Sequence, residues 1–260
     1  MPPDDRTVNG RAAAVPDDPT ARRAPRVALV TGATGAIGSA VARALAARGT
    51  RVAVGFRRDE AAGRALAAEL PGALAVRVDV ADPESVRVCF REVTEAAGLV
   101  SVLVGAAGTL RDRPVVRMRD EDWDDVLRTN LTGMFHCVRQ ALPSMIAQRF
   151  GRIVCVGSVS GTLGLPGQAN YAAAKAGLLG LTRSVARENG RYGITANVVA
   201  PGLVESPLTA GLGVPARERF LGLSATGRYV TPEDVAGAVR FCVDSPAVTG
   251  QLINVDGGLY

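Results

Sequence analysis

The chain has 260 residues, of which 47% are hydrophobic and 21% charged. This length and balance are typical of a globular α/β domain with a large core, and they exclude a chain that is disordered throughout. The formal net charge of +5 would suit a nucleic acid partner, but the arginines are scattered among acids and no arginine-rich run occurs. We therefore expect that no nucleic acid binds.

The first part of the chain differs in composition from the rest. Residues 1–24 contain four prolines among Asp and Arg and no apolar core, which predicts a disordered tail and not a signal peptide. No apolar run is long enough to cross a bilayer, so no membrane partner is expected. Residues 25–260 are predicted to form one domain.

Cysteine and histidine are too sparse for a disulfide framework or a metal site. Cys89, Cys137, Cys155 and Cys242 lack Cys-x-x-Cys spacing and lie in apolar surroundings, which indicates buried thiols in a reducing cytoplasm. His136 is the only histidine, which argues against a His-based catalytic triad and a His-rich metal cluster. We predict no metal.

A glycine-rich turn follows the first expected strand. Residues 26–31 form a short valine-rich run that is typical of a strand buried on both faces, and residues 32–38 read Gly-Ala-Thr-Gly-Ala-Ile-Gly before a helix. In this order, the N–H groups of the turn and the N-terminus of the helix face the pyrophosphate of a dinucleotide. The residues expected to contact the dinucleotide are Gly32, Thr34, Gly35 and Ile37.

The end of the second expected strand, over residues 51–56, decides between NAD and NADP. An acidic residue there would bind the ribose 2′-hydroxyl, whereas arginine would bind a 2′-phosphate. The strand is followed by Arg57 and Arg58, and the first acid is Asp59. This order favours NADPH, and the alternative is that both arginines are simply solvated.

Two further strands are expected to end at the cofactor. Residues 74–78 precede Asp79, which could accept a hydrogen bond from the adenine amine or cap the helix that begins near Pro83. Residues 101–104 run into Gly-Ala-Ala-Gly, small residues that allow the backbone to approach a flat cofactor. The cofactor residues predicted here are Asp79, Val80, Ala107 and Gly108.

Strands and helices alternate over the remaining chain. The charge run over 111–125 is interpreted as a solvated loop and a helix start, and a long helix with Asn130 and Gly133 is expected to follow. Residues 203–229, with scattered Gly and Pro, are interpreted as a substrate lid, and Thr231 as a helix N-cap. Further strands are expected over 152–156, 194–199 and 251–258. The alternation predicts an α/β fold: a parallel, doubly wound, Rossmann-like sheet of seven strands with helices on both faces.

Lys175 is the only lysine among the 30 Lys and Arg residues, and it follows Tyr171 by four positions in an Ala-rich run. Helical spacing places the two side chains on one face. A phenol titrates near ~10, and a unit charge about 5 Å away at an effective dielectric near 20 contributes roughly 3 kcal/mol. We therefore expect the pKa of Tyr171 to fall to roughly 7–8, which suits a general acid. An ordinary pair on a helix surface is the alternative.

These motifs together resemble the short-chain dehydrogenase/reductase family over residues 26–260. The matching pieces, in order, are the turn over 31–38, Asp79, the turn over 105–108, Asn130, Ser158, Tyr171 with Lys175, and Pro201-Gly202. More narrowly, residues 157–180 (GSVSGTLGLPGQANYAAAKAGLLG) and 193–206 (GITANVVAPGLVES) are similar to 3-oxoacyl-[acyl carrier protein] reductases and to type II polyketide ketoreductases.

The resemblance implies a role for each matched residue. Ser158 would hydrogen-bond the substrate carbonyl, Tyr171 would donate a proton to its oxygen, and Lys175 would hold the ribose and tune Tyr171. Asn130 would support a water that links the lysine to bulk solvent. The family pattern also implies cofactor contacts from Pro201, Gly202 and Val204.

The same resemblance implies an NADPH-dependent ketoreductase that acts on a ketone carried on acyl carrier protein, in a cytoplasmic homotetramer. Arg149 and Arg191 are then candidate landing sites for the acidic carrier. One alternative is a reductase of a free ketone, sugar or steroid, and another is a protein that binds the cofactor without turnover.

Two departures from the family pattern could loosen the cofactor site. Ala36 and Gly35 differ from the usual glycine turn: the methyl group of Ala36 could crowd the pyrophosphate, or be harmless if its backbone is already helical. Gly105 and Ala106 stand where relatives usually carry two asparagines.

Overall fold

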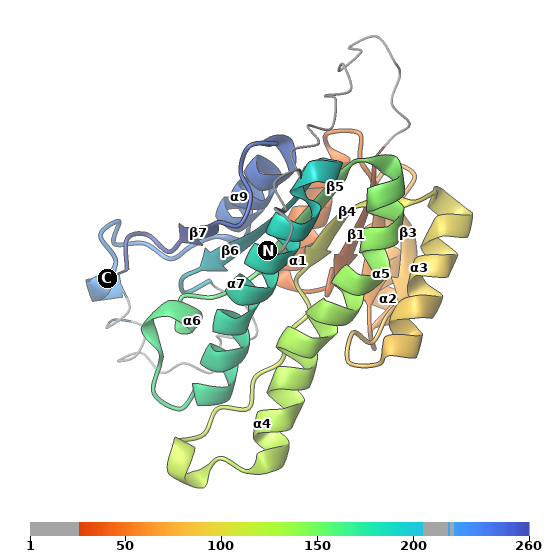
Figure 1. Cartoon of the computed structure of the whole chain (residues 1–260). Helices are drawn as coiled ribbons and strands as arrows, with labels where there is room; N and C mark the ends of the chain where they lie inside the picture. Colours follow the sequence, from red (N-terminus) through yellow and green to blue (C-terminus); the bar gives the residue numbers. More distant parts are fainter. Residues whose placement is uncertain (1–25, 205–217, 219–220, 260) are drawn as a thin grey trace, which may run out of the picture.

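The computed structural model describes residues 26–204, 218 and 221–259. The predicted tail over 1–24 and most of the predicted lid over 203–229 lie outside the described residues. A single parallel sheet runs through the protein in the order β3-β2-β1-β4-β5-β6-β7 (Figure 1), which confirms the predicted doubly wound fold. The strands are β1 Val27–Thr31, β2 Arg51–Phe56, β3 Leu74–Arg77, β4 Val100–Gly105, β5 Gly151–Val156, β6 Ile194–Pro201 and β7 Leu252–Val255.

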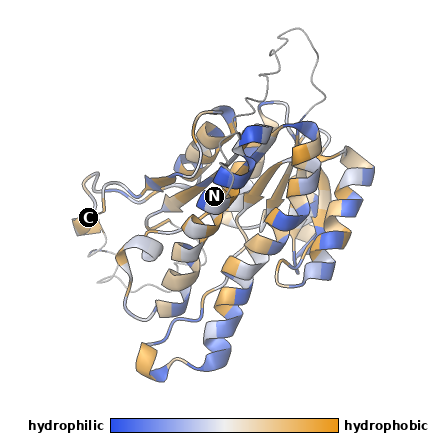
Figure 2. Cartoon of the chain, in the orientation of Figure 1, coloured by the Kyte–Doolittle hydropathy of each residue, from blue (hydrophilic) through white to orange (hydrophobic). Residues whose placement is uncertain are grey.

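Helices cover both faces of the sheet. The central strands are therefore buried along their whole length. One core cluster lies under α1 (Ala36–Ala46), α2 (Glu60–Glu69) and α9 (Pro232–Asp244). The other lies under α3 (Pro83–Ala97), α5 (Gly133–Gln148) and α7 (Ala169–Asn189). The strands are accordingly coloured mainly as hydrophobic in Figure 2, whereas the helices carry both hydrophobic and hydrophilic residues.

Strand register brings the carboxyl ends of the central strands together. Thr31 at the end of β1 pairs with Gly105 of β4, and Gly105 pairs with Cys155 of β5. The chain order reverses between β1 and β4, and this is where an open α/β sheet has its binding crevice. The fold therefore directs the loops after β1, β4, β5 and β6 to one edge.

Two local expectations need correction. The side chain of Asp82, and not that of Asp79, caps α3 by accepting a hydrogen bond from the N–H of Glu84 at 2.9 Å. The predicted long helix around Asn130 is divided: α4 (Asp120–Leu127) is joined to α5 by a π-helical turn over Arg128–Thr132. By contrast, Thr231 forms the predicted cap of α9. Its hydroxyl accepts from the N–H of Asp234, and the Asp234 carboxylate accepts from the N–H of Thr231.

Short helical turns complete the description: a 3₁₀ turn over Val115–Arg117, α6 over Ser160–Leu163 and a 3₁₀ turn over Gly190–Tyr192. Within the described part of the chain, no helix combines the length and apolar character needed to cross a bilayer. The four cysteines are buried free thiols, as predicted.

Candidate active site

A cavity of about 540 Å³ opens at the carboxyl edge of the sheet. Its size is within the range of cofactor and ligand sites. Most of the residues predicted for the site line this cavity: Gly32, Thr34, Gly35, Ile37, Ala107, Gly108, Ser158, Tyr171, Lys175, Pro201, Gly202 and Val204. The loops after β1, β4, β5 and β6 therefore meet here, as the strand register requires.

The glycine turn can be built only from glycine at two positions. Gly32 has φ +64°, and a Cβ there would lie 2.7 Å from the backbone of Ala107. A Cβ on Gly38 would overlap the carbonyl oxygen of Gly32. Both contacts are with backbone, which cannot move aside, so the turn keeps its close approach to the loop after β4.

The N-terminus of α1 is open toward the cavity. Gly35 is its N-cap and makes no side-chain capping bond, so the N–H groups of the first turn face outward, as an anion site requires. Ala36 is the first helical residue, which favours the alternative that its methyl group does not crowd the pyrophosphate. A Cβ on Gly35 would meet the Gly32 oxygen at 3.4 Å, an ordinary contact.

Four predicted cofactor residues do not line the main cavity. Arg57 and Arg58 lie exposed after β2, and the side chain of the neighbouring Asp59 caps α2 by accepting from Ala62 N–H at 2.9 Å. Asp79 is half-buried, and its carboxylate accepts from the N–H of Ala81 at 3.0 Å. The fourth, Val80, is buried against α5, where a Cβ on Gly133 would lie 2.7 Å from its side chain.

Tyr171 and Lys175 lie one turn apart in α7 and line the same cavity as Ser158. The Lys175 Nζ donates a hydrogen bond to the carbonyl oxygen of Val156 at 2.7 Å and lies 5.4 Å from the centroid of the Tyr171 ring. Lys175 is only 7% exposed. The lysine therefore ties α7 to the end of β5.

The predicted fall in the pKa of Tyr171 is wrong. Burial raises the pKa of Tyr171 to about 12, an effect that a hydrogen bond with Ser158 opposes and the charge of Asp112 reinforces. Burial also lowers the pKa of Lys175 to about 8. Desolvation wins over the expected charge effect because both groups are out of water and the Lys175 ammonium is directed to a carbonyl.

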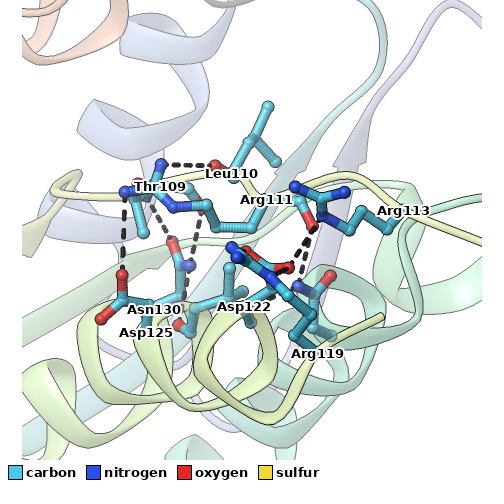
Figure 3. A network of polar contacts seen from close by, with 10 residues as sticks. Thr109, Leu110, Arg111, Arg113, Arg119, Asp122, Asp125 and Asn130 are labelled. Atoms are coloured by element: carbon cyan, nitrogen blue, oxygen red, sulfur yellow. Dashed lines mark hydrogen bonds and ion pairs between the residues drawn. The ribbon is translucent and has the colours of Figure 1, made fainter. Parts of the chain in front are cut away.

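Asn130 braces the loop that follows β4 (Figure 3). Its side-chain oxygen accepts from the N–H of Thr109 at 3.2 Å, and its amide nitrogen donates to the carbonyl oxygens of Thr109 and Val126 at 2.9 Å each. Asn130 also lines a second cavity of about 10 Å³ together with Lys175, large enough for one water.

The missing asparagine at Gly105 has a steric explanation. A Cβ at this position would overlap the sulfur of Met134, whose side chain is buried in the core beneath the end of β4. Met134 thus fills the space beside a glycine. The strand end is packed by an apolar side chain and not braced by an amide.

The charge run after β4 is more ordered than its composition predicts. Asp122 is buried and forms ion pairs with Arg113 at 2.8 Å and Arg119 at 2.9 Å (Figure 3). The hydrogen bond from Arg119 lowers the pKa of Asp122 to about 2. Asn170, fully buried beside Tyr171, donates to the carbonyl oxygens of Arg111 and Asp122 at 3.1 and 2.9 Å. The run is therefore fastened to the start of α7.

Three polar side chains of the cavity were not expected from the sequence: Asp112, Ser160 and Gln168. Ser160 and Gln168 lie in the stretch that carries the family resemblance, which was a usable signal. Asp112 lies in the charge run, where nothing distinguishes it from its solvated neighbours.

Comparison with known proteins agrees with this geometry. A family model described as Enoyl-(Acyl carrier protein) reductase matches residues 32–260. The 3-oxoacyl-[acyl-carrier-protein] reductase FabG of Staphylococcus aureus (strain Mu50) is 41% identical over 239 residues, which cover 90% of this chain and 97% of the relative. The corresponding reductase of Synechocystis is 42% identical over 241 residues (90% and 96% covered), and FabG of Escherichia coli K12 is 41% identical over 238 (90% and 97%). The chain therefore belongs to the short-chain dehydrogenase/reductase family of oxidoreductases.

Proposed function

We propose that this protein is an NADPH-dependent ketoreductase that reduces a 3-oxoacyl thioester on acyl carrier protein to the 3-hydroxyacyl form, in fatty acid or polyketide assembly in the cytoplasm. The observation that carries the proposal is the meeting of Ser158, Tyr171 and Lys175 at one cavity beside the glycine turn. The names of the FabG relatives, which specify a 3-oxoacyl substrate on a carrier, support it.

The hydroxyls of Ser158 and Tyr171 would hold the substrate carbonyl. They interact with each other and share the cavity, so a carbonyl oxygen between them can contact both hydroxyls. In the proposed step the phenol gives its proton to that oxygen, and Lys175 orients the ribose. When bound, NADPH supplies the hydride, while the glycine turn and the N-terminus of α1 hold its pyrophosphate.

The choice of NADPH rests on the end of β2. Arg57 and Arg58 are exposed there, and the carboxylate of Asp59 is engaged as the cap of α2. By the family resemblance, Gly35 stands where many NADPH-using relatives carry a basic residue, so recognition of the phosphate is left to these two arginines. A 2′-phosphate would find two cations, whereas a 2′-hydroxyl would find no free carboxylate from this turn.

The carrier protein is proposed to bind at Arg149 and Arg191. Both are exposed, their guanidinium groups lie 6.0 and 4.8 Å from the ring centroid of Tyr192, and Arg149 donates to the carbonyl oxygen of Arg191 at 3.1 Å. Among the described residues, neither arginine forms an ion pair with an acid. The pair is thus available to an acidic partner.

This basic pair lies at the opposite edge of the sheet from the cavity. Arg149 precedes β5, whereas Val156, at the end of β5, lines the cavity, and the strand alone spans about 20 Å. We therefore propose that the carrier serves the cavity of a second protomer in a homotetramer, packed antiparallel along α5 and α7. The exposed Phe135 on α5 is consistent with such an interface.

The matching family model is described by an enoyl substrate, so the reaction must be tested against both substrate types. We expect NADPH oxidation with acetoacetyl thioester, faster when it is carried on acyl carrier protein, and none with the enoyl thioester. Oxidation with free ketones alone would favour the alternative reductase. Cofactor binding without oxidation of any ketone would favour a non-catalytic protein.

Tyr171→Phe tests the proton donor within the same assay. The variant should keep its NADPH affinity, because only the phenol oxygen is lost, and turnover should fall by about 10²- to 10⁴-fold. Turnover near that of the wild type would refute the proposed role.

A further inference from the structure

Three polar side chains on the substrate side of the cavity have no role in the proposed mechanism. Ser160, Gln168 and Asp112 join Ser158 in one chain of hydrogen bonds. The Ser158 and Ser160 hydroxyl oxygens are 3.2 Å apart, Ser160 Oγ lies 2.9 Å from Gln168 Oε1, and Gln168 Nε2 lies 2.8 Å from Asp112 Oδ2. The chain connects the hydroxyl beside Tyr171 to a carboxylate on the loop after β4.

The carboxylate fixes the direction of every bond in this chain. Asp112 can only accept, so Gln168 must turn its NH₂ group toward it and its carbonyl oxygen toward Ser160. Ser160 then gives its single proton to Gln168, and its oxygen is left to accept from Ser158. The proton of Ser158 is thereby directed out of the cavity.

Ser158 also accepts from the backbone N–H of Ser160 at 3.1 Å, so it offers the cavity its one remaining lone pair, which meets the Tyr171 phenol, and not a proton. An alcohol that accepts a hydrogen bond from the Tyr171 phenol can donate its own proton to this lone pair while the hydrogen-bond chain stays intact. A ketone can only accept, so it must draw the Ser158 proton away from Ser160 and break one hydrogen bond. The direction of this chain of hydrogen bonds therefore favours binding of the alcohol over binding of the ketone by about the free energy of one hydrogen bond.

We propose that Asp112 is a positioning residue that, through Gln168 and Ser160, sets the direction of this chain and thereby determines how strongly the cavity binds a ketone relative to the corresponding alcohol. The inference rests on the proposed function, since that function assigns the substrate carbonyl to Ser158. It assigns Asp112 a part in ligand discrimination without contact with the reacting atoms.

Three variants distinguish the effect of the direction of the hydrogen-bond chain from the effect of the charge of Asp112. In Asp112→Asn, the amide can donate as well as accept, so Gln168 can turn round and the chain can reverse toward the ketone. The ratio of ketone to alcohol dissociation constants should fall about three- to ten-fold, the worth of one neutral hydrogen bond. Ser160→Ala interrupts the chain and should lower the ratio likewise. Asp112→Asn with Gln168→Glu keeps the net charge, restores an acceptor-only group facing Ser160 and should return the ratio to the wild-type value.

The dissociation constants are measured by calorimetry on the full chain in complexes that cannot react: acetoacetyl thioester with NADP⁺, and 3-hydroxybutyryl thioester with NADPH. An unchanged ratio in Asp112→Asn, or the same lowered ratio in the double variant, would overturn the inference, and so would failure of the wild type to bind either ligand. Thermal unfolding shows that each variant is folded.

The inference and the proposed function can fail separately. Absence of NADPH oxidation by the wild type would overturn the function, while the binding ratio still decides the direction of the chain. Normal turnover with an unchanged ratio in Asp112→Asn would overturn only the inference.

Discussion

The buried ammonium of Lys175 should destabilise the cofactor-free protein, and Lys175→Met tests this. Burial lowers the pKa of this 7% exposed side chain from 10.5 to about 8. A fall of this size corresponds to about 3 kcal/mol against the folded state at pH 7. Methionine removes that term but also the hydrogen bond to Val156, which contributes about 1 kcal/mol. We expect a net gain of about 2 kcal/mol, while turnover is lost.

The stability gain of Lys175→Met over the wild type should reverse at high pH. Since the folded pKa lies below the unfolded one, the unfolded chain holds the proton more tightly, and the wild type gains stability as pH rises from about 8 to 10.5. Near pH 10.5 the desolvation term is almost gone, and only the lost hydrogen bond to Val156 remains. The methionine variant should then be about 1 kcal/mol less stable than the wild type.

Thermal unfolding at pH 7 and pH 10.5 measures both differences. At roughly 2–4 °C per kcal/mol for a chain of this size, the variant should unfold about 4–8 °C higher than the wild type at pH 7. Arg187→Met is the matched control, because it removes an exposed, non-titrating cation from the same helix. A Lys175→Met difference that is equal at the two pH values, or negative at pH 7, would refute the reasoning.

Two further predictions concern the cofactor and the departure at β4. Arg57→Glu should weaken NADPH binding more than NADH binding in a fluorescence titration, and equal weakening would remove the assignment of a 2′-phosphate to this turn. Gly105→Asn should cost about 1–3 kcal/mol by overpacking against Met134, and adding Met134→Val should recover part of it. Additive effects in this double-mutant cycle, measured by denaturant unfolding, would show that the two positions do not share the space.

Much of the fold could be predicted because local sequence signals and long-range packing agree. The glycine turn after β1 has the required order, and sterics at Gly32 and Gly38 allow no other residue. The start of α9 carries Thr231, proline and acids in the expected positions, and the capping bonds form. Tyr171 and Lys175 share a helix face by spacing alone.

The less predictable features depend on the distance between segments far apart in the chain. Asp79 is a plausible cap of α3 by sequence, but the place where the helix starts gives this role to Asp82. Asp122 belongs to a charge run but is buried by its contacts with α7. Asp112 reaches the cavity because the loop is fastened to Gly167 and Gln168, with Arg113 N–H donating to the Gly167 carbonyl oxygen at 2.8 Å. Such contacts leave no local pattern.

The pKa values of Tyr171 and Lys175 suggest a different use for the single lysine than the sequence did. Desolvation moves the two pKa values apart, to about 12 for the phenol and about 8 for the ammonium. In the proposed mechanism, the tyrosinate left after Tyr171 gives its proton to the substrate is a stronger base than neutral lysine, so the two pKa values favour the return of a proton from Lys175 to Tyr171. In that mechanism the lysine would supply the proton that restores the phenol after each turnover and would not acidify it at rest. The cavity of about 10 Å³ between Lys175 and Asn130 has room for the water that would return a proton to the lysine. Burial of the pair supplies this driving force, which a solvent-exposed tyrosine and lysine at the same spacing would lack.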